Sequence, residues 1–203
     1  MGFEADTYRT LAKPSEEILL KERKSKFYGH AYPIQSEEVV KPIIEMLRKQ
    51  YANAGHVCYA WQLGIEQTTY RVSDDGEPNN SAGMPIYGQI KAFGLTNVLV
   101  TVTRVFGGTK LGVGGLIQAY KTAAQMALEN SETVVKTLET SLRITFAYSD
   151  MEKVMRIVKK HGLGLVSQKM ELDCEFEISC RKKMEEKVVQ LFNALPSISI
   201  HGK

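Results

Sequence analysis

The sequence has little of what marks a secreted, membrane-spanning or metal-clustered protein. Its 203 residues hold three cysteines, Cys58, Cys174 and Cys180, and no pair of them has zinc or thioredoxin spacing. We expect reduced, packed thiols and neither a bound metal nor another cofactor. The longest apolar runs are too short to span a membrane, and the first ten residues carry acids where a signal peptide has an apolar core. These absences predict a soluble, cytoplasmic protein without membrane contacts.

The sequence also lacks a strong excess of either charge. Its 26 Lys and Arg residues and 23 Asp and Glu residues give a formal net charge of +3. Total charge therefore gives no sign of nucleic-acid binding, which would require local clustering of cations. The apolar content of 43% is ordinary for a globular protein, and the length suffices for one domain with a sizeable core or for two small ones.

Glycine, by contrast, is concentrated in one stretch. A β-branched run predicts a strand over 97–106, a glycine-rich loop over 107–115 (the glycine loop) and an amphipathic helix to about Asn130. Backbone amides at such a helix start can bind an anion. The spacing fits neither a Walker A loop nor a dinucleotide fingerprint, and the alternative is that the glycines only permit a tight crossover. The candidate anion-binding residues are Arg104, Lys110, Gly114 and Gly115.

Carboxylates gather at Ser73–Pro78, SDDGEP, which we call the acidic turn. Asp74, Asp75 and Glu77 could hold a divalent cation or act as an acid–base pair. The ligand spacing of an EF-hand is absent, and Asp-Gly and Glu-Pro are ordinary turn pairs, so a solvated turn is the alternative. His56 precedes a predicted strand that carries Cys58, and packing explains that pair better than nucleophilic catalysis does.

After Ser131 the pattern becomes regular and predicts the order βαββαβ, the split ferredoxin-like unit. We place the boundary between the two domains so that they span 1–136 and 137–203. Basic residues occur on the polar sides of this unit's predicted helices, and two of them stand at a helix start, where cations are unfavourable. They are candidate RNA contacts, with solvated helix faces as the alternative: Lys153, Arg156, Lys160, Lys182 and Lys183.

Together these segments resemble the YigZ/IMPACT family. The motifs occur in the family's order, and the C-terminal unit matches the small domain of bacterial members. Two positions depart from the family's usual pattern: Val105 stands where tyrosine is usual, and Gln118 stands where arginine is usual. His56 and the carboxylates Asp74, Asp75 and Glu77 belong to the motifs that carry the resemblance, which are HVCYA (56–60), SDDGEP (73–78), SAGMP (81–85) and RVFGGTKLGVGGL (104–116).

The resemblance implies an α+β protein with two domains. The N-terminal domain would be similar to the fold shared by a ribosomal-protein domain and domain IV of elongation factor G, and the C-terminal ferredoxin-like domain would resemble domain V of that factor. For bacterial members the family offers a nucleic-acid- or ribosome-binding role. We therefore expect a non-enzymatic, translation-associated regulator that binds RNA or the ribosome.

Two other functions remain open from the sequence. One is a metal-assisted hydrolase or phosphoryl-transfer enzyme, which would use the acidic turn and the glycine loop on one substrate. The other is a protein-interaction module that presents the acidic turn to a protein partner. The first requires the two segments to meet in space.

Overall fold

The computed structural model of the protein describes residues 6–202, which form two compact units. One unit is Tyr8–Lys136, and the other begins at Thr137. Asp6 and Thr7, which we expected in the N-terminal domain, group with the C-terminal unit instead. The guanidinium of Arg181 donates to the two carboxylate oxygens of Asp6 at 2.9 and 3.0 Å, and this pairing ties the start of the described chain to the second unit.

The N-terminal unit is built on a five-stranded antiparallel sheet of order β2-β3-β6-β4-β5. Its central strand β6 is buried along almost its whole length, as its β-branched run predicts. The strands are β2 (Ile18–Glu22), β3 (Ser25–Pro33), β4 (His56–Leu63), β5 (Thr69–Ser73) and β6 (Val98–Val105).

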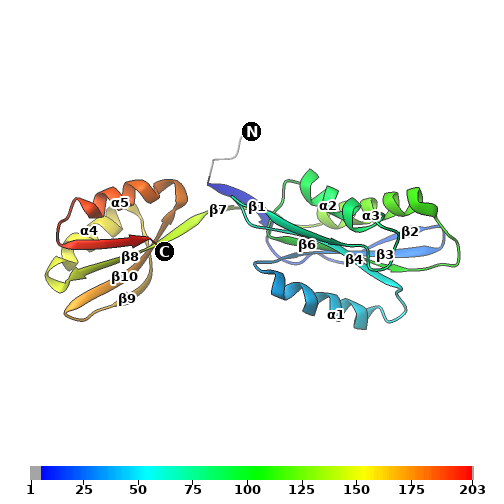
Figure 1. Cartoon of the computed structure of the whole chain (residues 1–203), viewed down its shortest axis with the longest axis horizontal. Coiled ribbons are helices and arrows are strands. Elements are labelled where there is room, and N and C mark those ends of the chain that lie inside the picture. The colour runs from blue at the N-terminus through cyan, green and yellow to red at the C-terminus, as the bar shows by residue number, and fades with distance from the viewer. Residues whose placement is uncertain (1–5, 203) are drawn as a thin grey trace. The chain divides into compact units, whose positions relative to one another are not determined.

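Helices cover both faces of this sheet (Figure 1). Helices α2 (Gly83–Ala92) and α3 (Gly112–Glu129) pack on one face over the main core, where Tyr120 meets Phe27 edge-on with ring centroids 5.2 Å apart. Helix α1 (Val40–Gln50) lies on the other face over a smaller apolar cluster. The two faces of the sheet therefore contact different helices and belong to different apolar clusters.

The C-terminal unit has the expected βαββαβ order, with a four-stranded antiparallel sheet of order β11-β8-β10-β9. Alternate residues of β8 and β10 face its core, where Phe146 and Phe176 meet edge-on at 5.0 Å. Its elements are β8 (Glu139–Ala147), α4 (Met151–His161), β9 (Gly164–Lys169), β10 (Asp173–Arg181), α5 (Glu185–Asn193) and β11 (Ile198–Gly202). The α+β class is thus confirmed. Within residues 6–202, no helix combines the length and apolarity needed to cross a bilayer.

Two details differ from the sequence predictions. Helix α3 begins at Gly112, so Gly114 and Gly115 lie in its first turn and not in the loop before it. A short two-stranded sheet of β1 (Thr7–Leu11) and β7 (Thr133–Thr137) was not predicted. Strands this short, paired across more than a hundred residues, leave no local signal because their pairing is decided by tertiary contacts.

The glycine loop is held against the tip of the β2–β3 hairpin. A Cβ at Gly107 would lie 2.0 Å from the carbonyl oxygen of Lys24, and the backbone N–H of Gly107 donates to Ser25 Oγ at 3.3 Å. At the tip, Arg23 and Lys24 have φ values of 43° and 70°, which turn the chain sharply. Only glycine fits at position 107 because the clashing group is backbone.

We predict that Gly107→Ala lowers the free energy of unfolding by about 1–3 kcal/mol, the usual cost of forcing atoms into a packed site. Urea denaturation of the full chain measures it. Gly114→Ala is the matched control, since a Cβ there meets nothing within 4 Å and alanine favours the helix. Equal losses in the two variants would contradict the close packing of loop and hairpin.

Candidate functional site

The acidic turn lies between β5 and α2, and its first carboxylate caps a helix. Asp74 Oδ1 accepts hydrogen bonds from the backbone N–H groups of Ala82 and Gly83, each at 2.9 Å, and Oδ2 accepts one from Asn80 at 2.8 Å. Gly83 is the first residue of α2. The N–H groups at a helix start have no partner within the helix, so Asp74 satisfies them and adds a negative charge at the favourable end.

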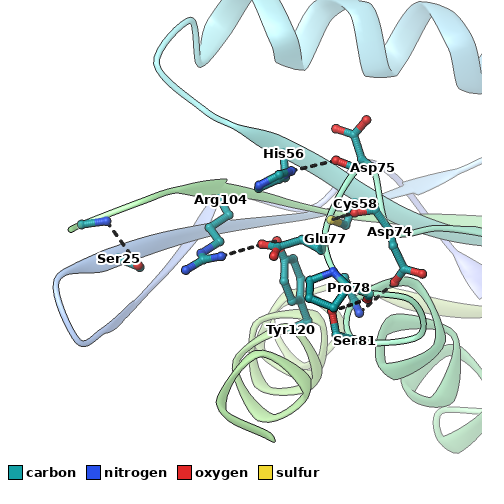
Figure 2. Close-up of polar contacts among 12 residues, drawn as sticks. Ser25, His56, Cys58, Asp74, Asp75, Glu77, Pro78, Ser81, Arg104 and Tyr120 are labelled. Carbon is teal, nitrogen blue, oxygen red and sulfur yellow. Dashed lines mark hydrogen bonds and ion pairs between the residues drawn. The ribbon is translucent and has the colours of Figure 1, made fainter. Parts of the chain in front are cut away.

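The second carboxylate joins the turn to the start of β4. Asp75 Oδ2 accepts a hydrogen bond from Val57 N–H at 2.6 Å, and Oδ1 pairs with Arg48 at 2.6 Å. His56 Nδ1 lies 2.7 Å from the carbonyl oxygen of Asp75 (Figure 2). His56 therefore holds the backbone of the turn, which is a positioning role.

The third carboxylate is buried and paired. Arg104 Nη1 donates to Glu77 Oε1 at 2.7 Å, and the Tyr120 hydroxyl donates to the same oxygen at 2.8 Å. The side chains of Glu77 and Arg104 are only 4% and 7% exposed, and Figure 2 shows the guanidinium directed toward the carboxylate. The rings of Phe27 and Phe106 lie 5.6 and 5.4 Å from Arg104 Cζ. The expectation that Arg104 faces a bound anion is thus corrected, because its charge is already neutralised by Glu77.

Cys58 lies beside this trio and carries no sign of reactivity. Its thiol contacts the carbonyl oxygen of Asp74 at 3.0 Å. Burial raises the pKa of the Cys58 thiol and of the Tyr120 hydroxyl, so both stay protonated at neutral pH. The thiolate that nucleophilic catalysis needs is therefore disfavoured, in agreement with a packed structural thiol.

The acidic turn meets the two elements that flank the glycine loop, because Glu77 contacts Arg104 of β6 and Tyr120 of α3. The three carboxylates of the turn are already hydrogen-bonded, because each accepts hydrogen bonds from the chain itself. Among residues 6–202, no group of three or more His, Cys, Asp or Glu side chains is arranged to hold a metal ion. The carboxylates of the acidic turn therefore hold together the segments at this corner of the N-terminal unit, where β6 ends and α3 begins. The glycine loop lies on the solvent-facing side of the same corner.

The outward surface of this corner is the start of α3. Lys110 and Gly114 are exposed, and a Cβ at Gly114 would meet open space. Over its described first turn, α3 has neither a side-chain cap nor an acidic residue. Its free N–H groups and its helix dipole therefore favour an anion from solvent.

Sequence reasoning missed the cations that complete this surface. Arg23, Lys24 and Lys26 are exposed on the hairpin that touches Gly107, in the run KERKSK at 21–26, and none of them was among the candidate anion- or RNA-binding residues. A cavity of about 220 Å³ lies between hairpin and helix, and Arg23, Gly115 and Gln118 are among its lining residues. The signal was available in the run's density of lysine and arginine, but its proximity to the loop depends on the β3–β6 pairing.

The cations expected in the C-terminal unit are largely paired with nearby acids. Lys153 pairs with Asp150 at 2.7 Å and Arg156 with Glu152 at 2.8 Å. Lys182 and Lys183 lie in a 3-10 turn before α5, whose first turn instead carries Glu185 and Glu186.

Lys182 pairs with Glu185 at 2.6 Å, so the suspected conflict with the helix dipole does not arise. Lys160 lies in the last turn of α4, where the dipole favours a cation. Three of the five candidates thus have acidic neighbours within their own unit, and the exposed cations next to the motif residues belong to the N-terminal unit.

Comparisons with known proteins agree with this architecture. A sequence profile described as the Impact N-terminal domain matches residues 23–128. The chain is 29% identical over 197 residues to the IMPACT family member YvyE of Bacillus subtilis, covering 97% of this chain and 88% of that protein. It is 39% identical over 126 residues to an IMPACT family member of Thermus thermophilus, covering 61% and 67% of the two chains.

A crystal structure of a hypothetical protein matches 98% of both chains with a TM-score of 0.72 at 22% identity, which is a likeness of fold. Fold and motif residues together define a two-unit α+β protein in which an Impact-type domain precedes a βαββαβ unit. The chain belongs to the IMPACT family.

We predict that Glu77→Gln lowers the free energy of unfolding by about 3–5 kcal/mol, because it leaves the Arg104 charge buried without a partner. Glu45→Gln is the control: its carboxylate is 58% exposed and lies 4.0 Å from Lys41, so the loss should stay below about 1 kcal/mol. Urea denaturation followed by circular dichroism compares them. A loss for Glu77→Gln no larger than for the control would show that the pair does not hold this corner together.

Proposed function

We propose that the protein is a non-enzymatic, translation-associated regulator that binds RNA or the ribosome through the glycine loop. The observation that carries the proposal is the meeting of three features on one surface: the uncapped first turn of α3, Lys110, and the cationic hairpin tip with Arg23 and Lys24. Phosphate groups are the anions that such surfaces bind in nucleic acids.

Two further features support RNA in particular. Phe106 is 52% exposed at the entrance of the glycine loop, where its ring is available for stacking with an unpaired base. The family resemblance implies that the N-terminal unit shares its fold with a ribosomal-protein domain and domain IV of elongation factor G, and that the second unit resembles domain V. That kinship favours the ribosome as the place of action.

The enzymatic alternative receives less support from the geometry. Asp74 caps α2, Asp75 holds β4, and Glu77 neutralises Arg104. A carboxylate that serves as metal ligand or general base needs free lone pairs directed at a substrate. These carboxylates use theirs on the protein itself.

A protein-interaction module is the second candidate function. The surface that would contact the partner protein is then the start of α3, and not the acidic turn. Val113 and Ile117 stand one turn apart on α3 and are 54% and 39% exposed. With Phe106 they place exposed apolar side chains around the glycine loop, a composition typical of protein contacts. A partner protein would then share the loop surface proposed for RNA.

The proposal predicts salt-dependent binding to fluorescently labelled single-stranded RNA, a duplex of the same sequence, or ribosomes. Lys110→Gln should weaken binding and lower the slope of log affinity against log salt by about one, since one phosphate contact is lost. Lys49→Gln, an exposed lysine on α1, should leave the slope unchanged. Absence of binding to all three probes at low salt would refute the proposed function.

A variant that is expected to strengthen RNA binding tests the same surface. Gln118 lines the cavity that also contains Arg23, and the family usually has arginine at this position. Gln118→Arg should raise RNA affinity at low salt and increase the salt slope by about one. Fluorescence anisotropy over a salt series measures both quantities, and unchanged affinity would exclude this cavity from the interface.

A further inference from the structure

Phe106 presents an aromatic ring to solvent directly after the end of β6. The side chain is 52% exposed, although β6 itself is buried along almost its whole length. Arg104, two residues earlier, places its guanidinium over this ring, with Cζ 5.4 Å from the ring centroid. One face of the Phe106 ring is therefore backed by the protein, and the exposed area belongs to the opposite face and the edge.

The groups on either side of Phe106 are themselves held in place. Arg104 is 7% exposed, bonds Glu77 at 2.7 Å, and lies 5.6 Å from the ring of the fully buried Phe27. Gly107, the next residue, leaves no room for a Cβ beside the carbonyl group of Lys24. A ring that is already ordered loses little conformational entropy when it stacks on a ligand.

Exposed cations lie beside this ring. Lys110 is exposed in the glycine loop that follows Phe106, and Arg23 and Lys24 are exposed at the tip of the hairpin that touches Gly107. Proteins that bind single-stranded nucleic acid combine these two features, because the aromatic ring stacks on a base while the cations contact the neighbouring phosphates.

A stacking ring and a cationic surface prefer different forms of RNA. The bases of a duplex stack on one another, so their faces are closed to a side chain, whereas unpaired bases can stack on an aromatic ring. Phosphate charge acts in the other direction, because a duplex has the higher charge density and releases more counterions for each contact. A surface of cations alone would therefore bind a duplex at least as tightly as a single strand.

We propose that the glycine-loop surface selects single-stranded RNA, with one unpaired base stacked on the outer face of Phe106 and the adjoining phosphates on Lys110 and the hairpin cations. The inference rests on the proposed function, because it names the class of RNA that the same surface binds. Phe106 is then the residue that determines specificity, and Arg104, neutralised by Glu77, only backs the ring.

Fluorescence anisotropy of the full-length protein tests the preference directly. The probes are a labelled oligoribonucleotide without self-complementarity and the blunt-ended duplex that it forms with its complement. The single strand should bind roughly tenfold more tightly than the duplex at equal salt. Equal affinities, or tighter duplex binding, would overturn this inference and leave the proposed function standing. Failure to bind either probe would refute the proposed function itself.

An abasic strand of the same length separates bases from phosphates without any change to the protein. It keeps the phosphate charges but offers no base for stacking. The wild-type protein should therefore bind it roughly tenfold more weakly than the intact strand. Equal binding of the two strands would show that only phosphates are contacted, and would overturn the inference even if no variant at position 106 folds.

Substitutions at Phe106 assign the preference to its ring. Phe106→Leu should weaken binding of the single strand roughly tenfold and leave the affinity for the duplex and the abasic strand unchanged. Phe106→Tyr, which keeps a ring, should retain the wild-type preference. Tyr148→Leu is the matched control, since Tyr148 is an aromatic residue of the C-terminal unit that is 62% exposed.

Thermal unfolding checks that these variants are folded. An equal loss of single-strand and duplex binding in Phe106→Leu would overturn the inference, because the ring would then not distinguish unpaired bases. A loss in Tyr148→Leu as large as in Phe106→Leu would overturn it as well, because the effect would then not belong to the glycine loop.

Discussion

The buried contact of Glu77 with Arg104 and Tyr120 is the constraint on which the N-terminal unit depends. It joins three segments distant in sequence: the acidic turn, the end of the central strand β6, and the third turn of α3. Charges in a protein interior are tolerated only when paired and hydrogen-bonded. Because each partner needs the other two, the turn, the strand and the helix must come together in one arrangement.

This pairing also decides which charges face solvent. The carboxylates of the acidic turn accept hydrogen bonds from the start of α2, from Val57 and from Arg104. The cations of the hairpin tip and Lys110 remain outside, around the uncapped first turn of α3. A chain with nearly balanced total charge thereby gathers exposed cations on one surface, where Glu22, 4.0 Å from Arg23, is a neighbouring anion. The total composition cannot reveal such a surface, because it does not show which charged side chains are paired inside the folded protein.

The same distinction explains what could be predicted from the sequence. The C-terminal unit was predictable because alternate residues of β8 and β10 are buried, which leaves a period of two in the chain. The order of strand, loop and helix in the glycine stretch was also predictable, although α3 begins at Gly112, inside the predicted loop. The burial of Arg104 was not, since its partner Glu77 lies 27 residues back, and Tyr120, which donates to the same carboxylate, lies 16 residues forward. The hairpin cations were overlooked for the same reason, as their position beside Gly107 follows from the β3–β6 register.

The two faces of the five-stranded sheet differ in how completely their buried polar atoms are hydrogen-bonded. Under α2 and α3 the core is apolar apart from the Glu77–Arg104 pair, and Arg104 Nε is the one buried polar side-chain atom there without a partner among residues 6–202. Under α1, threonine, histidine and tryptophan side chains are buried with polar atoms unpaired. Such groups destabilise a fold that gains nothing from them, since aliphatic residues would pack as well. Packing therefore explains the first face, whereas the second buries polar side chains with atoms that have no hydrogen-bond partner within residues 6–202.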